Sequence, residues 1–230
     1  MKVRITERKP GESARDYAFR VIKDNIVALE LAPGSMLSEN EIAEQLGLSR
    51  TPVREALIDL NRVKVVEVIP QRGSRISLID YALVEQARFL RLVVEEGVCR
   101  LAASLPGDVS FSELDENLKL QRFYLDNPNP AKLFMLDNEF HALLFRLAGK
   151  PVCYEWLQDG IIVHFDRVRS MSLATLKEPK IVEDHQGILD AVKGHDATRA
   201  AALMSEHLSR YRIDEKAIKE KYPSYFLPSA

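Results

Sequence analysis

The N-terminal fold is decided by residues 48–57, Leu48-Ser49-Arg50-Thr51-Pro52-Val53-Arg54-Glu55-Ala56-Leu57. This stretch predicts the start of a short helix, because Ser49 or Thr51 can cap free N–H groups and Pro52 is tolerated in a first turn. The apolar residues that recur at helical spacing can face a core: Val53, Leu57 and Leu60. Arg50, Thr51 and Arg54 then lie on the exposed side near the helix N-terminus, where the helix dipole and the two arginines favour phosphate.

A second short helix is predicted just before this stretch. Ser38-Glu39-Asn40-Glu41 has the form of a capping box, and Gly47 ends the helix that it opens. Two short helices joined by a tight glycine turn form a helix-turn-helix, whose second helix enters the major groove of DNA. A β-rich run at 65–69, a turn at 70–74 that contains Arg72, and an alternating run at 75–79 predict a hairpin that follows as a wing.

This ordered set of motifs resembles the GntR superfamily of bacterial transcription regulators. The resemblance is carried by Ala32-Pro33-Gly34, Leu37-Ser38-Glu39, Ile42-Ala43, Leu46-Gly47-Leu48, Ser49 to Leu57, and Arg72-Gly73. The chain departs from the family at Asn40, where some members have a DNA-contacting arginine, and at Val63-Lys64-Val65, which replaces an acidic residue followed by Gly-Leu. The residues that we expect to contact DNA are Ser49, Arg50, Thr51, Arg54, Arg72 and Gly73.

The charge distribution agrees with a local DNA-binding surface. The whole chain of 230 residues has a net charge of −2, yet residues 1–79 carry a net charge of +2 and the rest −4. Residues 49–79 contain six basic and three acidic side chains. A basic patch on an acidic protein suits specific, salt-sensitive DNA binding better than bulk electrostatic capture.

We expect a cytoplasmic protein. Met1-Lys2-Val3-Arg4 leads into a charged segment without the apolar run of a signal peptide. No stretch approaches the roughly 20 apolar residues that a membrane helix needs. Cys99 and Cys153 do not form a disulfide framework or a metal-ligand pair and are expected to be buried small hydrophobes.

The predicted fold class is mainly α: an N-terminal winged helix-turn-helix with a small β-hairpin wing, then an all-α bundle of about six helices. We expect a DNA-binding domain over 1–79, with a flexible leader over 1–11 and a first helix from about 12 to 31. A helical effector-binding, metal-binding and dimerisation domain is expected over 80–230. Its predicted helices are Tyr81–Ser104, Ser112–Asp126, Pro130–Ala148, Val152–Leu173, Pro179–Lys193 and Asp196–Glu220. The tail from Tyr222 is expected to pack or fray without regular structure.

The helix that begins at Tyr81 carries a second resemblance. Arg91-Leu92-Val93-Val94-Glu95 and Arg100-Leu101-Ala102-Ala103 resemble the opening helix of the FCD domain, the ligand-binding domain of the FadR subfamily. The resemblance continues to about His207. It implies a helical cavity that binds small organic acids.

Four residues are predicted to converge on one metal ion. Asp137 and His141 are four apart on one helix face. His185 and His207 lie on either side of the turn at 193–195, about 12 Å and about 15 Å away from it along antiparallel helices, which puts them at nearly equal height. Three imidazoles and one carboxylate suit Zn²⁺, Ni²⁺, Mn²⁺ or Fe²⁺. The set also matches the metal-binding subset of the FCD family position by position.

Two cations are candidates for effector binding. Arg91 can clamp a carboxylate, although a surface pair between Arg91 and Glu95 fits the spacing nearly as well. Lys150 stands where family members often have asparagine after the Ala-Gly pair; it either adds a positive charge to the pocket or is a solvated helix end. His195 is expected to be solvated, and His164 faces either the pocket or the core.

The function predicted from these patterns is that of a ligand-responsive bacterial transcription regulator and not of an enzyme. We expect a repressor, although an activator also fits, that binds a pseudo-palindromic operator as a homodimer. A metal-assisted pocket would bind its effector, a small organic acid. One rival is a metal-dependent enzyme that acts on a small carboxylate, because such a site can activate water. Another is a regulator whose metal is only structural or is itself the signal.

Overall fold

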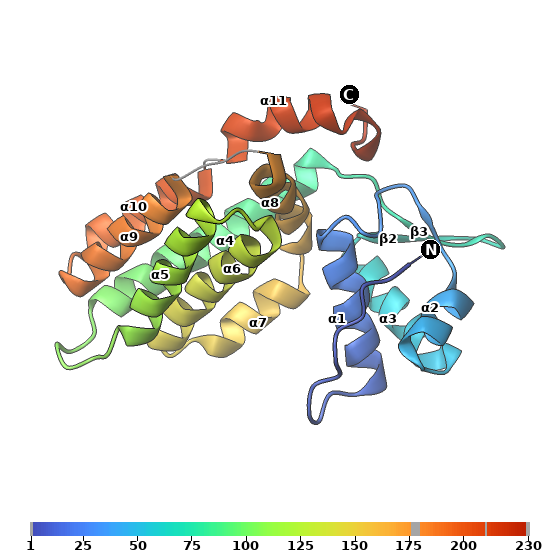
Figure 1. Ribbon diagram of the computed structural model, residues 1–230, viewed down its shortest axis with the longest axis horizontal. Coiled ribbons are helices and arrows are strands. Elements are labelled where there is room, and N and C mark those ends of the chain that lie inside the picture. Colours follow the sequence, from blue (N-terminus) through green and yellow to red (C-terminus); the bar gives the residue numbers. More distant parts are fainter. Residues whose placement is uncertain (1, 176–179, 210, 229–230) are drawn as a thin grey trace.

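The computed structural model describes residues 2–175, 180–209 and 211–228. Figure 1 shows the first helices and the hairpin gathered on one side and the later helices bundled on the other. The N-terminal part follows the predicted order of helix-turn-helix and wing. Its elements are α1 (Ala14–Val27), β1 (Met36–Leu37), α2 (Glu39–Leu46), α3 (Arg50–Arg62), β2 (Val66–Ile69) and β3 (Gly73–Ile76).

The helix-turn-helix forms through the local signals expected from the sequence. The Ser38 side chain accepts a hydrogen bond from the backbone N–H of Glu41 at 3.3 Å, which caps α2. Gly47 ends α2 in the left-handed region, with φ of 63°. Ser49 is the residue that precedes α3, but its hydroxyl makes no capping hydrogen bond. The hydroxyl at the start of α3 therefore remains available to an external acceptor or donor.

The wing is an antiparallel hairpin in which Ile69 pairs with Gly73 across a three-residue loop. The structure adds one strand that the sequence patterns did not indicate. β1, only two residues long, pairs with β3, so that the sheet order is β1-β3-β2. Two residues are too few for an alternating pattern, which explains why β1 was missed.

The expectation of a flexible leader is wrong. Val3 is only 4% exposed and packs into the core around α1 to α3. Asn25 of α1 holds the backbone of Arg4 on both sides: its side-chain oxygen accepts the Arg4 N–H at 2.8 Å, and its amide donates to the Arg4 carbonyl at 2.9 Å. Gln45 also accepts the Val3 N–H at 2.8 Å, and Arg20 donates to the Glu7 carbonyl at 2.9 Å, so hydrogen bonds to side chains of the domain order a leader whose composition looks unstructured.

The C-terminal part is a helical bundle, as predicted, but its described residues form eight α-helices. The predicted helix Val152–Leu173 is two helices, because the chain turns after Gly160, where an added Cβ would lie 2.9 Å from the Trp156 carbonyl. The predicted helix Asp196–Glu220 is also two; residue 210, between them, lies outside the described residues. The helices are α4 (Tyr81–Ala103), α5 (Ser112–Asp126), α6 (Pro130–Leu147), α7 (Pro151–Asp159), α8 (Val163–Thr175), α9 (Lys180–Lys193), α10 (Ala197–Ser209) and α11 (Tyr211–Lys221).

Helix α8 connects the two hydrophobic cores. Val163 belongs to the core of the N-terminal part, whereas Phe165 and Val168 belong to the core of the bundle. His164 Nε2 lies 2.7 Å from the carbonyl oxygen of Val63, the residue that ends α3, and the Arg167 guanidinium donates to the Ser77 carbonyl at 2.8 Å. One helix of the bundle therefore contacts both the end of the recognition helix and the segment that follows the wing.

The C-terminal tail packs and is partly regular. Pro223–Tyr225 form a 3₁₀ turn. The N–H of Ile79 donates to the Tyr225 carbonyl at 2.8 Å, and the Phe226 ring stacks on Tyr81 with ring centroids 5.3 Å apart. The tail thereby fixes the connection between the wing and α4. Among the described residues, no helix is both long and apolar enough to cross a membrane.

Candidate functional site

The side chains predicted to contact DNA lie on one exposed surface formed by α3 and the wing. Arg54 and Gly73 line the same groove, a hollow of 390 Å³ between α3 and the β2–β3 loop. Arg50 remains 68% exposed, although one guanidinium nitrogen lies 3.6 Å from a carboxylate oxygen of Glu39. The remaining predicted residues are also exposed: Ser49, Thr51 and Arg72. The groove therefore joins one helix residue, Arg54, to one wing residue, Gly73, while the other four predicted residues are exposed outside its lining.

The four predicted metal ligands meet in the bundle interior. Each of Asp137, His141, His185 and His207 offers one ligand atom, and these atoms all lie within 4.8 Å of one another. His185 Nε2 lies 3.2 Å from His207 Nε2 and 3.6 Å from Asp137 Oδ1. His141 Nε2 is 4.0 Å from Asp137 Oδ2. The i, i+4 pair on α6 and the antiparallel pair α9–α10 converge as their spacing predicted.

Each imidazole uses its other nitrogen to contact an oxygen of the surrounding shell. His141 Nδ1 contacts the Glu95 carboxylate, His185 Nδ1 is 2.9 Å from Gln121 Oε1, and His207 Nδ1 is 3.5 Å from the Asp184 carboxylate. Because carboxylate and amide oxygens accept hydrogen bonds, the contacts of His141 and His185 favour the tautomer with the proton on Nδ1, in which the Nε2 lone pair faces the centre.

Burial keeps these imidazoles neutral. It lowers the pKa of His141 against the opposing charge of Glu95, and it lowers the pKa of His185 well below the usual range. Burial also lowers the pKa of His207 to about 4, although Asp184 acts in the opposite direction. Neutral imidazole is the form that ligates metals. The cluster is therefore in a ligating state at neutral pH.

The donor set fits a divalent cation. His141 Nε2 is buried and has no hydrogen-bond partner among the described residues, and the Nε2 atoms of His185 and His207 lie 3.2 Å apart. Two imidazole nitrogens at this distance share either a proton or a cation. Arg169 supplies one positive charge at the edge of the cluster, where it pairs with Asp137 and also donates to Asn138 Oδ1 at 3.0 Å.

Arg91 lies in the interior next to this cluster. Its side chain is 1% exposed and forms the i, i+4 pair with Glu95, but the pair is buried and not on the surface. Its two terminal nitrogens are buried without a hydrogen-bond partner among the described residues, and one is 4.0 Å from Asp166. Burial opposes ionisation of Glu95, but Arg91 and His141 outweigh it and lower the pKa of that carboxyl.

The structure does not bring Lys150 to the cluster. Lys150 is exposed where α6 turns into α7, nine residues beyond His141, which corresponds to about 13 Å along a helix. His164 contacts Val63 instead of the cluster, and His195 Nδ1 lies 3.0 Å from the Ala103 carbonyl.

The shell residues Glu95, Gln121, Asp184 and Arg169 were not predicted to support the site. Gln121 and His185 are 64 residues apart, so no local spacing relates them.

Comparison with known proteins identifies both parts of the chain. Residues 15–76 match the family model of bacterial regulatory proteins of the gntR family, and residues 86–210 match the FCD domain. The chain is 38% identical over 223 residues to an uncharacterised HTH-type transcriptional regulator in an unstable DNA locus of Streptomyces ambofaciens, covering 96% of this chain and 92% of that protein. It is 30% identical over 222 residues to the HTH-type transcriptional repressor RspR of Escherichia coli K12, covering 96% and 97%.

A solved structure agrees with the fold. E. coli McbR/YncC superposes with a TM-score of 0.76 at 20% identity and covers 91% of this chain and 99% of that one. The relatives are transcription regulators and not enzymes, which removes the enzyme alternative. The chain is a DNA-binding transcription regulator that belongs to the gntR family of bacterial regulatory proteins and carries an FCD domain.

Proposed function

We propose that this regulator is a cytoplasmic repressor of the FadR subfamily that binds a pseudo-palindromic operator as a homodimer and releases it when a small organic acid binds beside a divalent transition metal. The DNA-binding domain comprises residues 1–79, and the effector and dimerisation domain comprises residues 80–230. The observation that carries the proposal is the convergence of one carboxylate and three imidazole rings in the bundle interior, with the buried Arg91–Glu95 pair next to them.

DNA contact is assigned to the groove between α3 and the wing. Arg54 lines that groove, while Arg50 lies one turn earlier on the exposed side of α3. Arginine reads guanine edges or pairs with phosphate. Ser49 and Thr51 add hydroxyls at the helix N-terminus, where phosphate binds favourably. Arg72 and Gly73 place the wing against the adjacent backbone.

Dimerisation is assigned to the outer face of α4. Phe89 is 62% exposed and Val93 is 54% exposed, and Leu90 and Leu101 continue the apolar surface along the same helix. Exposed apolar patches of this kind mark protein interfaces in otherwise soluble folds. An isologous contact through this face would place one recognition helix in each half-site of a two-fold operator.

The metal would be held by Asp137, His141, His185 and His207, and it would supply a Lewis-acidic point for carboxylate or hydroxyl oxygens. The donor set suits Zn²⁺, Ni²⁺, Mn²⁺ or Fe²⁺. Arg91 would bind a carboxylate of the effector, because its two terminal nitrogens make no hydrogen bond within the described residues and form the fork that carboxylates match. Lys150 is exposed and lies beyond the end of α6, directly before α7, so the effector role falls to Arg91 and not to Lys150.

Helix α8 offers a direct route from this site to the DNA-binding domain. Arg169 of α8 pairs with Asp137, and His164 of the same helix contacts the carbonyl at the end of α3. A small movement of α8 would therefore change the placement of the recognition helix relative to the bundle.

Operator release tests the proposal. Fluorescence anisotropy of a labelled operator is measured against small mono-, di- and hydroxycarboxylates, with metal-loaded and chelated protein. We expect release by an acid only with metal present, and no response in Arg91→Gln. DNA release by metal alone, without any acid, would show instead that the metal is the signal.

A further inference from the structure

Residues 77–80 connect the wing to α4, and hydrogen bonds from both parts of the fold hold their backbone. On the side of the N-terminal part, Ser77 donates its N–H to the Val65 carbonyl at 3.0 Å. On the side of the bundle, the buried Arg167 guanidinium donates to the carbonyls of Ser77 and Leu78 at 2.8 and 3.4 Å. The first half of the connection is therefore fixed to both parts.

The second half of the connection is held by residues 223–228, which we call the strap. Ile79 and Phe226 form a parallel β-bridge. The N–H of Ile79 donates to the Tyr225 carbonyl at 2.8 Å, and the Ile79 carbonyl accepts the N–H of Leu227 at 3.0 Å. Ile79 is 1% exposed and Phe226 is 7% exposed, so the bridge is shielded from water. The strap thus binds both backbone polar groups of Ile79.

The strap is itself anchored to the bundle. Ile218 of α11, five residues before the strap, is fully buried in the bundle core, and Tyr222 and Tyr225 pack against the same core. The rings of these two tyrosines stack with centroids 5.4 Å apart. The Lys219 ammonium lies 4.2 Å from the ring centroid of Tyr81, the first residue of α4. The strap therefore holds Ile79 in a fixed place on the bundle.

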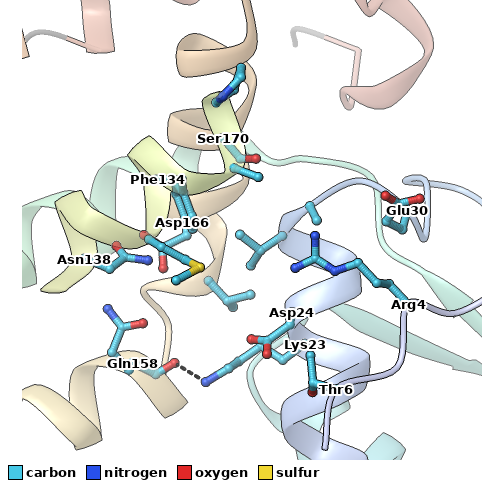
Figure 2. Close-up of a pocket in the computed structure, with 16 residues that line it drawn as sticks. Arg4, Thr6, Lys23, Asp24, Glu30, Phe134, Asn138, Gln158, Asp166 and Ser170 are labelled. Carbon is cyan, nitrogen blue, oxygen red and sulfur yellow. Dashed lines mark hydrogen bonds between the residues drawn. The ribbon is translucent and has the colours of Figure 1, made fainter. Parts of the chain in front are cut away.

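Elsewhere the two parts of the fold face each other across a cavity. Figure 2 shows this cavity of 420 Å³, with Arg4 on the N-terminal side and Asn138 on the bundle side. Lys23 of α1 reaches the bundle beside it and donates to the Gln158 carbonyl at 3.0 Å. Walls separated by a cavity gain no packing energy from each other. The orientation of the N-terminal part therefore depends strongly on α8 and on the strapped connection.

From these contacts we propose that the strap sets the orientation of the DNA-binding domain on the bundle, so that a dimer presents its two recognition helices at the spacing of the operator half-sites. The proposal rests on the proposed homodimer. After one domain has bound, the other reaches its half-site at an effective concentration that depends on how narrowly the connection restricts it. A connection released from the strap would sample further orientations, whose entropy is lost on binding.

Fluorescence anisotropy of the full chain with two DNA probes tests this proposal. One probe is the operator that the wild type selects from a random-sequence DNA pool, and the other is the same duplex with one half-site scrambled. Deletion of residues 223–230 removes the strap, and Leu227→Pro removes the N–H that donates to the Ile79 carbonyl. Ser224→Ala, an exposed position of the strap, is the matched control. Circular dichroism and analytical ultracentrifugation check folding and oligomeric state.

We expect the deletion variant to bind the two-site operator about tenfold more weakly than the wild type, with unchanged affinity for the single half-site. Leu227→Pro, which loses one hydrogen bond, should bind the two-site operator about threefold more weakly. Ser224→Ala should bind both probes as the wild type does.

Unchanged two-site affinity in the deletion variant, or an equal loss for both probes, would overturn the proposal. If the deletion variant does not fold, Leu227→Pro decides by the same comparison. A wild type that binds both probes equally would overturn the proposed two-site function together with the role of the strap, so failure of the strap alone is distinguishable.

Discussion

The hydrogen-bond acceptors around the three imidazoles determine which nitrogen of each ring faces the centre of the cluster. Glu95, Gln121 and the Asp184 carboxylate face Nδ1 atoms, so every Nε2 points to the centre. Such outer partners orient ligands and raise their basicity, and their removal costs about 10- to 100-fold in metal affinity. The cluster is therefore best tested through residues that touch the histidines without being ligands themselves.

Asp184→Asn should weaken metal affinity about tenfold, because His207 loses a charged acceptor while all four ligands remain. Competition with a chromogenic chelator measures the change. Asp190→Asn, an exposed substitution on the same helix, is the control and should bind metal like the wild type. Equal affinity in the two variants would contradict the assigned role of Asp184.

On the DNA surface, Arg54→Ala should reduce specific operator affinity by about 1–3 kcal/mol, which is roughly 5- to 150-fold. Its metal content should not change. Fluorescence anisotropy at fixed salt measures the affinity, with Arg146→Ala, at a 58% exposed position of α6, as the control. Wild-type affinity in Arg54→Ala would remove this residue from the DNA interface.

The sequence could predict the convergence of the four residues but not their surroundings. Asp137 and His141 follow from one helical turn, and His185 and His207 from equal distances to a glycine turn. The contact between His141 and Glu95 spans 46 residues and depends on how α4 packs against α6. Whether Arg91 is buried depends on the same packing, so the spacing to Glu95 alone left it undecided.

At the scale of elements, the break between α7 and α8 decides which residues contact the DNA-binding domain. One continuous helix through residue 160 would not turn there, whereas the break lets α8 present Val163 and His164 to the N-terminal part. The Asp159-Gly160 pair was the sequence signal for this break between α7 and α8. Because helical periodicity continues on both sides of the pair, the sequence analysis predicted one helix.

Gly160→Ala should lower the free energy of unfolding by about 1–3 kcal/mol, because its Cβ would lie 2.9 Å from the Trp156 carbonyl oxygen. Gly187→Ala inside α9, where the added Cβ would lie 3.5 Å from a methyl group of Leu203 on α10, should be neutral or stabilising. Urea unfolding measures both. A neutral Gly160→Ala would show that the turn tolerates a side chain.

The contact between α8 and α3 should depend on pH. Burial lowers the pKa of His164 to about 4 from an ordinary value of 6.5, despite the opposing hydrogen bond to Val63. The folded state therefore favours the neutral imidazole of His164. The contribution of this neutral imidazole to the free energy of unfolding is complete above about pH 6.5 and is lost as the pH falls toward 4. Between pH 7.5 and pH 5.5, the free energy of unfolding should fall by on the order of 1 kcal/mol less in His164→Gln than in the wild type, as measured by urea unfolding. Equal decreases in the two proteins would contradict this role of His164.

At the scale of the whole molecule, two cores share one helix, and the bundle leaves an apolar face of α4 uncovered. Val93→Glu should convert the proposed dimer to a monomer in analytical ultracentrifugation, because burying a carboxylate in an apolar interface is costly. Leu120→Glu on α5, at a position of similar exposure, should leave the dimer intact. The opposite pattern would move the interface from α4 to α5.

Metal content tests the residues, the packing of the elements and the function of the whole molecule together. A metal bound by all four residues requires the predicted ligands and the packing of α6 against α9 and α10, and the proposed regulatory chemistry depends on that metal. Elemental analysis of the purified native chain is compared with His185→Ala and His207→Ala, and His195→Ala serves as the control outside the cluster. We expect about one transition metal per wild-type or His195→Ala chain and none in the two ligand variants. Wild-type chains that bind no metal when supplied with Zn²⁺, Ni²⁺, Mn²⁺ or Fe²⁺ would show that the three histidines are core residues.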